Sequence, residues 1–244
     1  MRAFVTFVVA AQAVSAQAPA PPCSQYDPTH ALETPCNIEL VNSTRYQIRV
    51  YGTPSGQSFS TARVSAPSWS RATQAGFQLN FAYIEGANKA SKKIPMTAPV
   101  VTRNPSGDEA NWLVSFFTPQ SIYPTGADVS VSRRTRARGR RHHLSPLIFT
   151  LPTPHLREKA PVPTNGNMTI EDIPLSTFAV VEFGGEANEA DYKLASTLLK
   201  DALVADGRML APSEDEWAEA WCGYDAPNDL FNRHNEAWVK ILLA

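Results

Sequence analysis

The block at Lys93–Val100, which reads KIPMTAPV, constrains this 244-residue chain more than any other stretch. Proline lacks a backbone donor, and the residue before a proline is pushed out of the helical region, so Pro95 and Pro99 exclude a helix here. Just upstream, Tyr83–Asn88 reads YIEGAN and contains a glycine of the kind that ends helices. We therefore predict a helix that stops near Gly86 and leads into an irregular, extended edge strand over 94–102.

Two halves of the chain repeat one predicted order of elements. Alternating polar and apolar residues predict strands, and Ser68 can cap the start of a helix. The elements expected in the first half are strands at 45–52, 59–65, 94–102 and 111–118 and a helix at 68–86. The second half is expected to hold two strands within 168–183 broken near Pro174, a helix at 186–206, and strands at 216–224 and 235–243. The pattern predicts an α+β fold with a pseudo-twofold repeat, in one domain at 41–244.

Both predicted helices have apolar faces. The second helix is expected to bury Leu194, Leu198 and Ala202, beside Ala195, Leu199 and Leu203. The first helix has one apolar stripe made by Trp69, Ala72, Gly76, Leu79 and Tyr83, and another made by Phe77, Phe81 and Ile84. Because one core contact needs less apolar surface than this, we expect a ligand site on the first helix. The alternative is that both stripes pack within the domain.

The N-terminal segment is typical of a targeting signal. Arg2 precedes an apolar run from Ala3 to Val14, which is shorter than the roughly 20 residues of a membrane span. We predict a cleaved secretory signal at 1–18, followed by a Pro-rich arm at 19–40, and a secreted protein. An uncleaved anchor and an organelle-targeting leader are the alternatives.

Cysteines and glycosylation triplets also bear on whether the protein is secreted. Cys23 and Cys36 could form a disulfide in an oxidising compartment, or could be two free thiols. Cys222 lies in a predicted strand, where we expect a small buried apolar residue. The triplets that begin at Asn42 and Asn167 are N-glycosylation sequons, which agree with secretion.

Several collinear blocks resemble the SOUL family of haem-binding proteins. They are YIEGAN and KIPMTAPV, with Tyr46–Gly52, Trp112–Pro119, Ala160–Asn165, Gly223–Pro227 and Phe231–Trp238, and together they span most of 45–242. The resemblance implies that 41–244 is a SOUL domain. It also implies the architecture of the α+β fold, a distorted antiparallel β-barrel flanked by two α-helices.

The resemblance further implies a shallow apolar groove for a tetrapyrrole on the first helix. Carried over to this sequence, it nominates Arg71, Gln74, Phe77 and Phe81 as binding residues. The two phenylalanines would supply an apolar floor, and Arg71 could pair with a propionate. Some members have a histidine proposed as an iron ligand where this chain has Val50, which leaves His234 as a candidate axial ligand.

Residues 121–154 interrupt the resemblance. Joining Gln120 to His155 would restore a continuous family sequence, and structureless loops longer than about 12–15 residues are uncommon inside compact domains. The segment contains a run of six arginines between Arg133 and Arg141. We predict a disordered insertion or a retained intron at about 121–154. The other interpretation of the arginine run is an anion-, nucleic-acid- or membrane-binding patch.

The sequence contains none of the common enzyme motifs. We find no Gly-rich phosphate loop, nucleophile elbow, His-Glu-x-x-His or Cys-x-x-Cys, and Asp225 and Glu236 are interpreted as solvated or bonded to backbone donors. The net charge of −1 excludes a strongly basic nucleic-acid binder. We expect a non-enzymatic protein that carries or sequesters haem or another porphyrin non-covalently, with no transmembrane segment beyond the signal. The alternative is a protein- or membrane-interaction module with incidental haem affinity.

Overall fold

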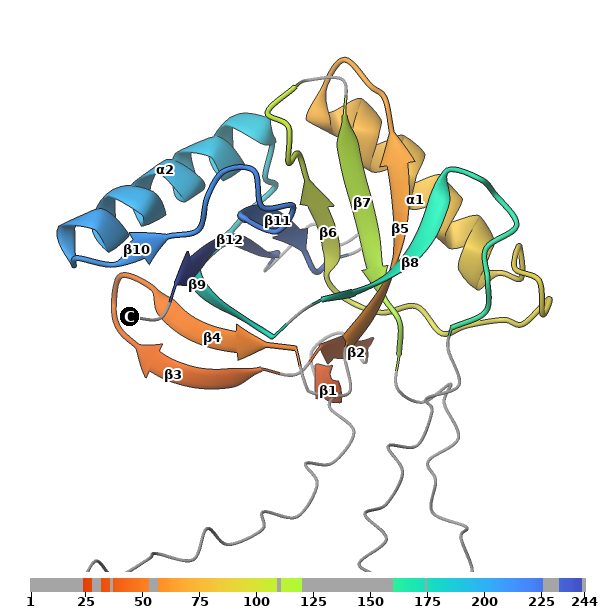
Figure 1. The fold of residues 1–244 in the computed structure, drawn as a ribbon, viewed down its shortest axis with the longest axis horizontal. Helices are drawn as coiled ribbons and strands as arrows, with labels where there is room; N and C mark the ends of the chain where they lie inside the picture. Colours follow the sequence, from red (N-terminus) through yellow and green to blue (C-terminus); the bar gives the residue numbers. More distant parts are fainter. Residues whose placement is uncertain are drawn as a thin grey trace, which may run out of the picture.

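The computed structural model describes residues 24–27, 32–35, 37–52, 57–108, 111–119, 160–173, 175–225 and 233–242. In this part of the chain an antiparallel sheet curls into a half-barrel, and two helices lie outside it (Figure 1). The helices are α1 (Trp69–Ile84) and α2 (Glu189–Ala205). The strands are β1 (Ser24–Asp27), β2 (Leu32–Pro35), β3 (Ile38–Asn42), β4 (Gln47–Tyr51), β5 (Gln57–Val64), β6 (Val100–Arg103), β7 (Trp112–Phe117), β8 (Met168–Ile173), β9 (Ser176–Gly184), β10 (Met209–Leu210), β11 (Glu219–Gly223) and β12 (His234–Leu242).

The strand order confirms the predicted fold class. The sheet runs β3-β4-β9-β12-β11-β6-β7-β5-β8, with β10 paired to β12, so β3 and β8 are its two terminal strands. Along the chain, β4-β5-α1-β6-β7 is followed by β8-β9-α2-β11-β12, with the short β10 after α2. The two halves therefore share a strand-strand-helix-strand-strand order, as the hydrophobic patterns predicted.

The proline block differs from its prediction. Residues 94–99 form no strand, and β6 begins only at Val100 and lies inside the sheet between β11 and β7, not at an edge. Thr97 makes an isolated bridge to Glu33 of β2, and its hydroxyl donates a 2.6 Å hydrogen bond to the Phe117 carbonyl. The strand starts after the second proline because each proline removes a donor that a ladder needs.

The buried face of α2 differs from the predicted one. Leu199 and Leu203 are buried against β9 and β12, whereas Leu194 and Leu198 are 59% and 60% exposed. A helix that packs on a sheet with one side buries a single stripe of residues, and residues 194 and 198 lie on the side of the helix that faces away from that stripe. The helix also begins later than predicted, after Asn188, which forms a capping box with Asp191.

The core divides into the inner face of the half-barrel and one layer beneath each helix. The inner face is filled by aromatic side chains, of which Tyr51 stacks on Trp238 with ring centroids 4.3 Å apart. Cys222 lies in the same cluster with no exposed surface, which confirms its predicted burial.

Some predictions concern residues outside the described part of the chain, or only partly inside it. The signal at 1–18, both cysteines of the proposed disulfide and the insertion at 121–154 lie outside the described residues. The arm predicted at 19–40 contains β1 and β2, and β3 begins inside it. Because β3 pairs with β4, the sheet of the domain starts at Ile38, three residues before the predicted boundary.

Candidate ligand-binding site

The outer face of α1 brings the four nominated binding residues onto one surface. Arg71 and Gln74 are exposed, Phe77 is half-buried, and Phe81 is 43% exposed. The rings of Phe77 and Phe81 stack at a centroid distance of 5.9 Å and an interplanar angle of 12°. Phe77 also meets Phe116 of β7 edge to face at 5.2 Å. Phe77 therefore anchors the pair to the core, and Phe81 presents an aromatic surface to solvent.

A hollow of about 610 Å³ lies on the same helix toward its N-terminal end, and neither of the two rings lines it. Its lining residues are Ser65, Ala66, Pro67, Arg71, Gln74, Ala75 and Gln78. The volume is within the range of about 300–1,000 Å³ that is typical of small-molecule sites. None of the lining residues is a histidine, cysteine, methionine or tyrosine, so the hollow offers apolar contact, hydrogen bonds and one guanidinium, but no axial iron ligand.

Two buried residues fix the position of α1 on the sheet. Gly76 lies so close to β7 that an added Cβ would be 2.4 Å from the Cβ of Val114. Asn80 is fully buried, and its amide donates to the carbonyls of Gly76 and Val114 at 2.9 and 2.8 Å. Its side-chain oxygen accepts a 2.8 Å bond from the Ser60 hydroxyl of β5. Asn80 is a positioning residue that sequence reasoning missed, although an asparagine four residues after Gly76 on an apolar face is a visible signal.

His234 is not brought to the α1 face. It begins β12, which is separated from β7 and β5 by β11 and β6 in the strand order, whereas α1 contacts β5 and β7. Its Nε2 lies 2.9 Å from Oε1 of Glu236, and its ring packs edge to face on Tyr224 with centroids 4.5 Å apart. The histidine is therefore engaged by a protein carboxylate at a second location.

Glu236 is the centre of a buried polar network that the sequence did not predict. Its carboxylate is 2% exposed and accepts bonds from Arg49 at 2.9 Å, Tyr224 at 2.8 Å and the Trp238 indole at 2.6 Å. Burial raises the pKa of Glu236, but the bond from His234 and the charge of Arg49 outweigh burial and hold that pKa below its usual value. The expectation that Glu236 is solvated or bonded to backbone donors is wrong, whereas Asp225 does accept a backbone bond, from the His234 amide.

Glu182, His234 and Glu236 also place three possible metal-ligand atoms within 4.8 Å of one another. Arg49 lies among them and bonds to both carboxylates, at 2.5 Å to Glu182 and 2.9 Å to Glu236. The guanidinium already supplies the positive charge that a metal ion would bring. We therefore interpret the cluster as an ion-pair network rather than a metal centre.

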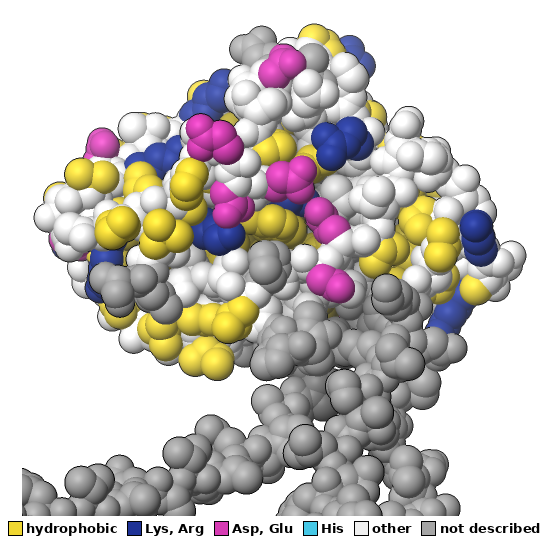
Figure 2. All heavy atoms as spheres, in the orientation of Figure 1, with side chains coloured by type: hydrophobic (Ala, Val, Ile, Leu, Met, Phe, Trp, Pro, Cys, Tyr) yellow, Lys and Arg dark blue, Asp and Glu magenta, His cyan; other side chains and the backbone are white. Residues whose placement is uncertain are grey.

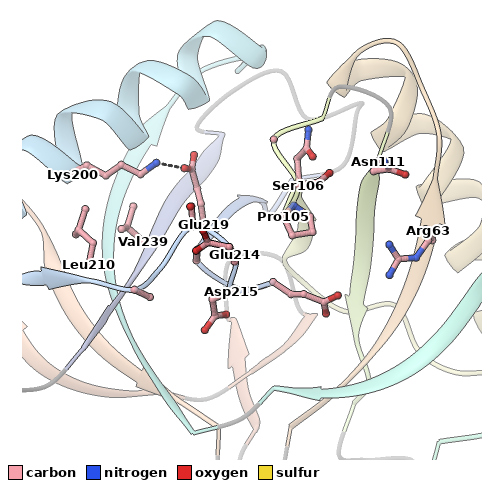
Figure 3. A pocket seen from close by; sticks show the side chains of 16 residues that line it. Arg63, Pro105, Ser106, Asn111, Lys200, Leu210, Glu214, Asp215, Glu219 and Val239 are labelled. Atoms are coloured by element: carbon pink, nitrogen blue, oxygen red, sulfur yellow. Dashed lines mark hydrogen bonds and ion pairs between the residues drawn. The ribbon is translucent and has the colours of Figure 1, made fainter.

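A larger hollow of about 1060 Å³ opens between α2, the loop at 104–107 and the segment at 211–216 (Figure 3). Lys200 of α2 pairs with Glu219 of β11 on one side, and Arg63 of β5 lies on the other. Four carboxylates line it, those of Glu214, Asp215, Glu216 and Glu219. Figure 2 shows acidic side chains gathered over the middle of this face. A flat apolar macrocycle placed here would desolvate carboxylates that it cannot pair.

Neither α1 nor α2, the helices of the described region, is long and apolar enough to cross a membrane.

Comparison with known proteins agrees with the fold. The chain is 26% identical over 186 residues to Heme-binding protein 1 of Xenopus laevis, covering 75% of this chain and 78% of that protein. It is 27% identical over 194 residues to human Heme-binding protein 2, covering 80% and 77% of the two chains.

One solved structure, the EcmrR–DNA complex, shares the fold alone, with a TM-score of 0.50 and 15% identity over 83% of this chain and 59% of that one. The family model described as SOUL heme-binding protein matches residues 32–140 and 129–240. With its repeated halves, curled sheet and flanking helices, the chain belongs to the SOUL heme-binding protein family.

Proposed function

We propose that this protein binds haem or a related tetrapyrrole non-covalently on the outer face of α1 and carries or sequesters it without changing it. The observation that carries the proposal is that one helix of a SOUL domain presents both the stacked, partly exposed pair Phe77 and Phe81 and, toward its N-terminal end, a hollow of about 610 Å³. The named relatives, Heme-binding proteins 1 and 2, support the class of ligand.

The residues present fit a macrocycle through apolar contact and charge. A porphyrin is flat and apolar with acidic propionates at one edge, so Phe81 can cover the ring while Arg71 pairs with a carboxylate. Gln74 and Gln78 line the same hollow and supply hydrogen-bonding amides. Bound haem would supply its own iron and colour, and the described residues of this face supply no ligand to the iron.

The α1 face is a better tetrapyrrole site than the larger hollow between α2 and the 104–107 loop. The larger hollow is lined by four carboxylates against the two cations Arg63 and Lys200, and Lys200 is already paired with Glu219, so the excess negative charge would repel the propionates of the ligand. On α1 the only charged residue lining the hollow is Arg71, which attracts them. Charge, rather than volume, decides between the two sites.

An absorbance titration with haem and with iron-free porphyrin tests the proposal. We expect both ligands to bind saturably, because the face supplies apolar burial and no iron ligand. Phe81→Asp should weaken both by roughly ten- to a hundredfold, because losing a buried aromatic contact costs about 1.5–3 kcal/mol.

The matched control is Leu194→Asp, which places the same charge on an apolar residue of α2 that is 59% exposed. We expect this variant to bind both ligands like the parent. No binding by the folded parent protein would refute the proposal, and equal losses in the two variants would refute the site. Binding of haem but not of iron-free porphyrin would show that an iron ligand is required and move the site away from this face.

A second candidate function is a protein-interaction module with incidental haem affinity. The observation that favours it is the exposed apolar side of α2, where Leu194 and Leu198 have no cover among the described residues. The two proposals separate on the variants above, because Leu194→Asp would disrupt such an interaction while leaving the ligand titration unchanged.

We also propose that residues 1–18 direct the chain into the secretory pathway, with an organelle as the alternative destination. The apolar run from Ala3 to Val14 supports this proposal. Expression of the full chain with a C-terminal tag in a eukaryotic host, followed by N-terminal sequencing of the product in the medium, tests it. A product that stays in the cytosol would overturn it.

A further inference from the structure

We propose that Asn42 and Asn167 carry N-linked glycans that cover the two open edges of the sheet. The sequence holds two acceptor triplets, Asn42-Ser43-Thr44 and Asn167-Met168-Thr169. Asn42 is the last residue of β3, and Asn167 directly precedes β8. These are the two terminal strands of the described sheet, so each acceptor lies at the end of an edge strand.

Both acceptors are accessible to a modifying enzyme. Asn42, Ser43 and Thr44 are all exposed, and the Asn42 amide makes one exposed bond of 3.2 Å to Glu39. Asn167 and Thr169 are exposed as well, while Met168 between them is buried and ties this turn to the core.

A third asparagine serves as a contrast within the same chain. Asn104-Pro105-Ser106 has the outer residues of a sequon, but the proline in the middle removes it as an acceptor. Asn104 lines the charged hollow beside α2 rather than an edge strand. The two competent triplets therefore lie at the sheet edges, and the incompetent one lies where a glycan would fill the hollow.

Edge strands need protection because their free backbone groups can pair with another chain. On β3 the hazard is strengthened by Ile38 and Leu40, which are 65% and 51% exposed. Figure 2 shows hydrophobic side chains gathered at the lower left, where Figure 1 places β3. Strand residues advance by about 3.3 Å each, so a bulky oligosaccharide on Asn42 starts about 7–13 Å from these two side chains. On β8 the exposed Asp172 already discourages pairing.

The modification needs a glycosyl donor of defined chemistry, a lipid-diphosphate-linked oligosaccharide in the lumen of the secretory pathway. The bond between the anomeric carbon and the diphosphate oxygen breaks, and a new bond forms from that carbon to Nδ2 of the asparagine. The amide loses one proton, and the lipid diphosphate leaves with the bonding electron pair. The inference rests on the secretory routing proposed above and is independent of tetrapyrrole binding.

The test is expression of the full chain through a eukaryotic secretory pathway, followed by glycosidase treatment and mass mapping of the two asparagines. We expect a mass loss that corresponds to two glycans. Thr44→Ala should remove the glycan on Asn42 and Thr169→Ala the glycan on Asn167, whereas Thr44→Ser and Thr169→Ser should retain them. Secreted protein without either glycan would overturn the proposal, and so would protein that never enters the pathway.

A second measurement tests the protective role on β3. Sedimentation of the Thr44→Ala variant should show concentration-dependent association where the parent remains monomeric. Adding Ile38→Lys to that variant should restore the monomer, because a charge on an edge strand blocks pairing. A Thr44→Ala variant that lacks the glycan and stays monomeric at every concentration would overturn the protective role.

Discussion

For Gly76→Ala the structure predicts a loss of stability, whereas helix propensity alone predicts a gain. In the interior of an exposed helix, replacing glycine with alanine stabilises by about 0.8–1.0 kcal/mol. Here the new methyl group would lie 2.4 Å from the Cβ and 2.5 Å from a Cγ of Val114. Carbon atoms pack at about 3.5–4.0 Å, so α1 would have to lift from β7 by about 1 Å or more.

The expected magnitude follows from two opposing effects. Overpacking of a close-packed core costs about 1–3 kcal/mol. The upper part of that range applies because the Val114 Cβ is attached to the strand backbone and cannot rotate away. Subtracting the propensity gain of about 1 kcal/mol leaves a destabilisation of about 2 kcal/mol. Lifting α1 would also lengthen the 2.8 Å bond from Asn80 to the Val114 carbonyl.

Urea unfolding followed by circular dichroism measures this change, with Ala82→Gly as a control on the exposed side of the same helix. The control should lose about 1 kcal/mol through propensity alone. In a Val114→Ala background the Gly76→Ala penalty should shrink without vanishing, because the two Cγ atoms leave and the Cβ remains. A Gly76→Ala protein as stable as the parent, with the same dependence on denaturant, would refute the close approach of α1 to β7.

Three further predictions concern buried polar groups. Asn80→Leu should destabilise by about 2 kcal/mol in urea unfolding, because it leaves the buried Ser60 hydroxyl without its Asn80 acceptor, and an unsatisfied buried group costs about 1–3 kcal/mol. Glu236→Gln should lower the unfolding free energy by about 1–3 kcal/mol, since it removes one of the two carboxylates paired with Arg49 and leaves Glu182 as the other; an unchanged unfolding free energy would contradict its burial. The hydrogen bond from His234 to Glu236 raises the pKa of His234 above 6.5, and this effect outweighs the lowering caused by burial. The stability that protonated His234 contributes is therefore complete below pH 6.5 and is lost as the pH rises through the folded-state pKa. His234→Gln should flatten that dependence in unfolding measured from about pH 6 to about pH 8, and an unchanged slope would contradict the assignment.

Local signals in the sequence predicted the order of elements well. Ser68 caps α1 as expected, with its hydroxyl accepting from the Arg71 amide, and Gly86 follows the helix with a positive φ of 116°. Alternating polarity predicted β4 and β5, as is typical of strands with one face on the core. The prediction of a strand through 94–99 was wrong, since the two prolines permit an extended chain there but deny it ladder bonds.

For the proposed site, the sequence named residues of α1, and the structure shows which of them reach the surface. The sequence identified Phe77 and Phe81 as surplus apolar residues on α1, and the fold leaves Phe81 43% exposed. On α2 the same reasoning failed, because periodicity gives the spacing of apolar residues but not the direction of the sheet. Leu194 and Leu198 therefore looked like core residues although they lie outside.

By itself the sequence determined the class of fold, the repeated halves and the helix that carries the proposed site, because caps, prolines and hydrophobic period act within a few residues. Only the tertiary structure decided which strands are edges, and so where Asn42 and Asn167 lie on the sheet. It alone joined Arg49 and Glu236, which are 187 residues apart, into one buried pair. Such contacts depend on how strands pair across the whole chain, and no local pattern encodes that pairing.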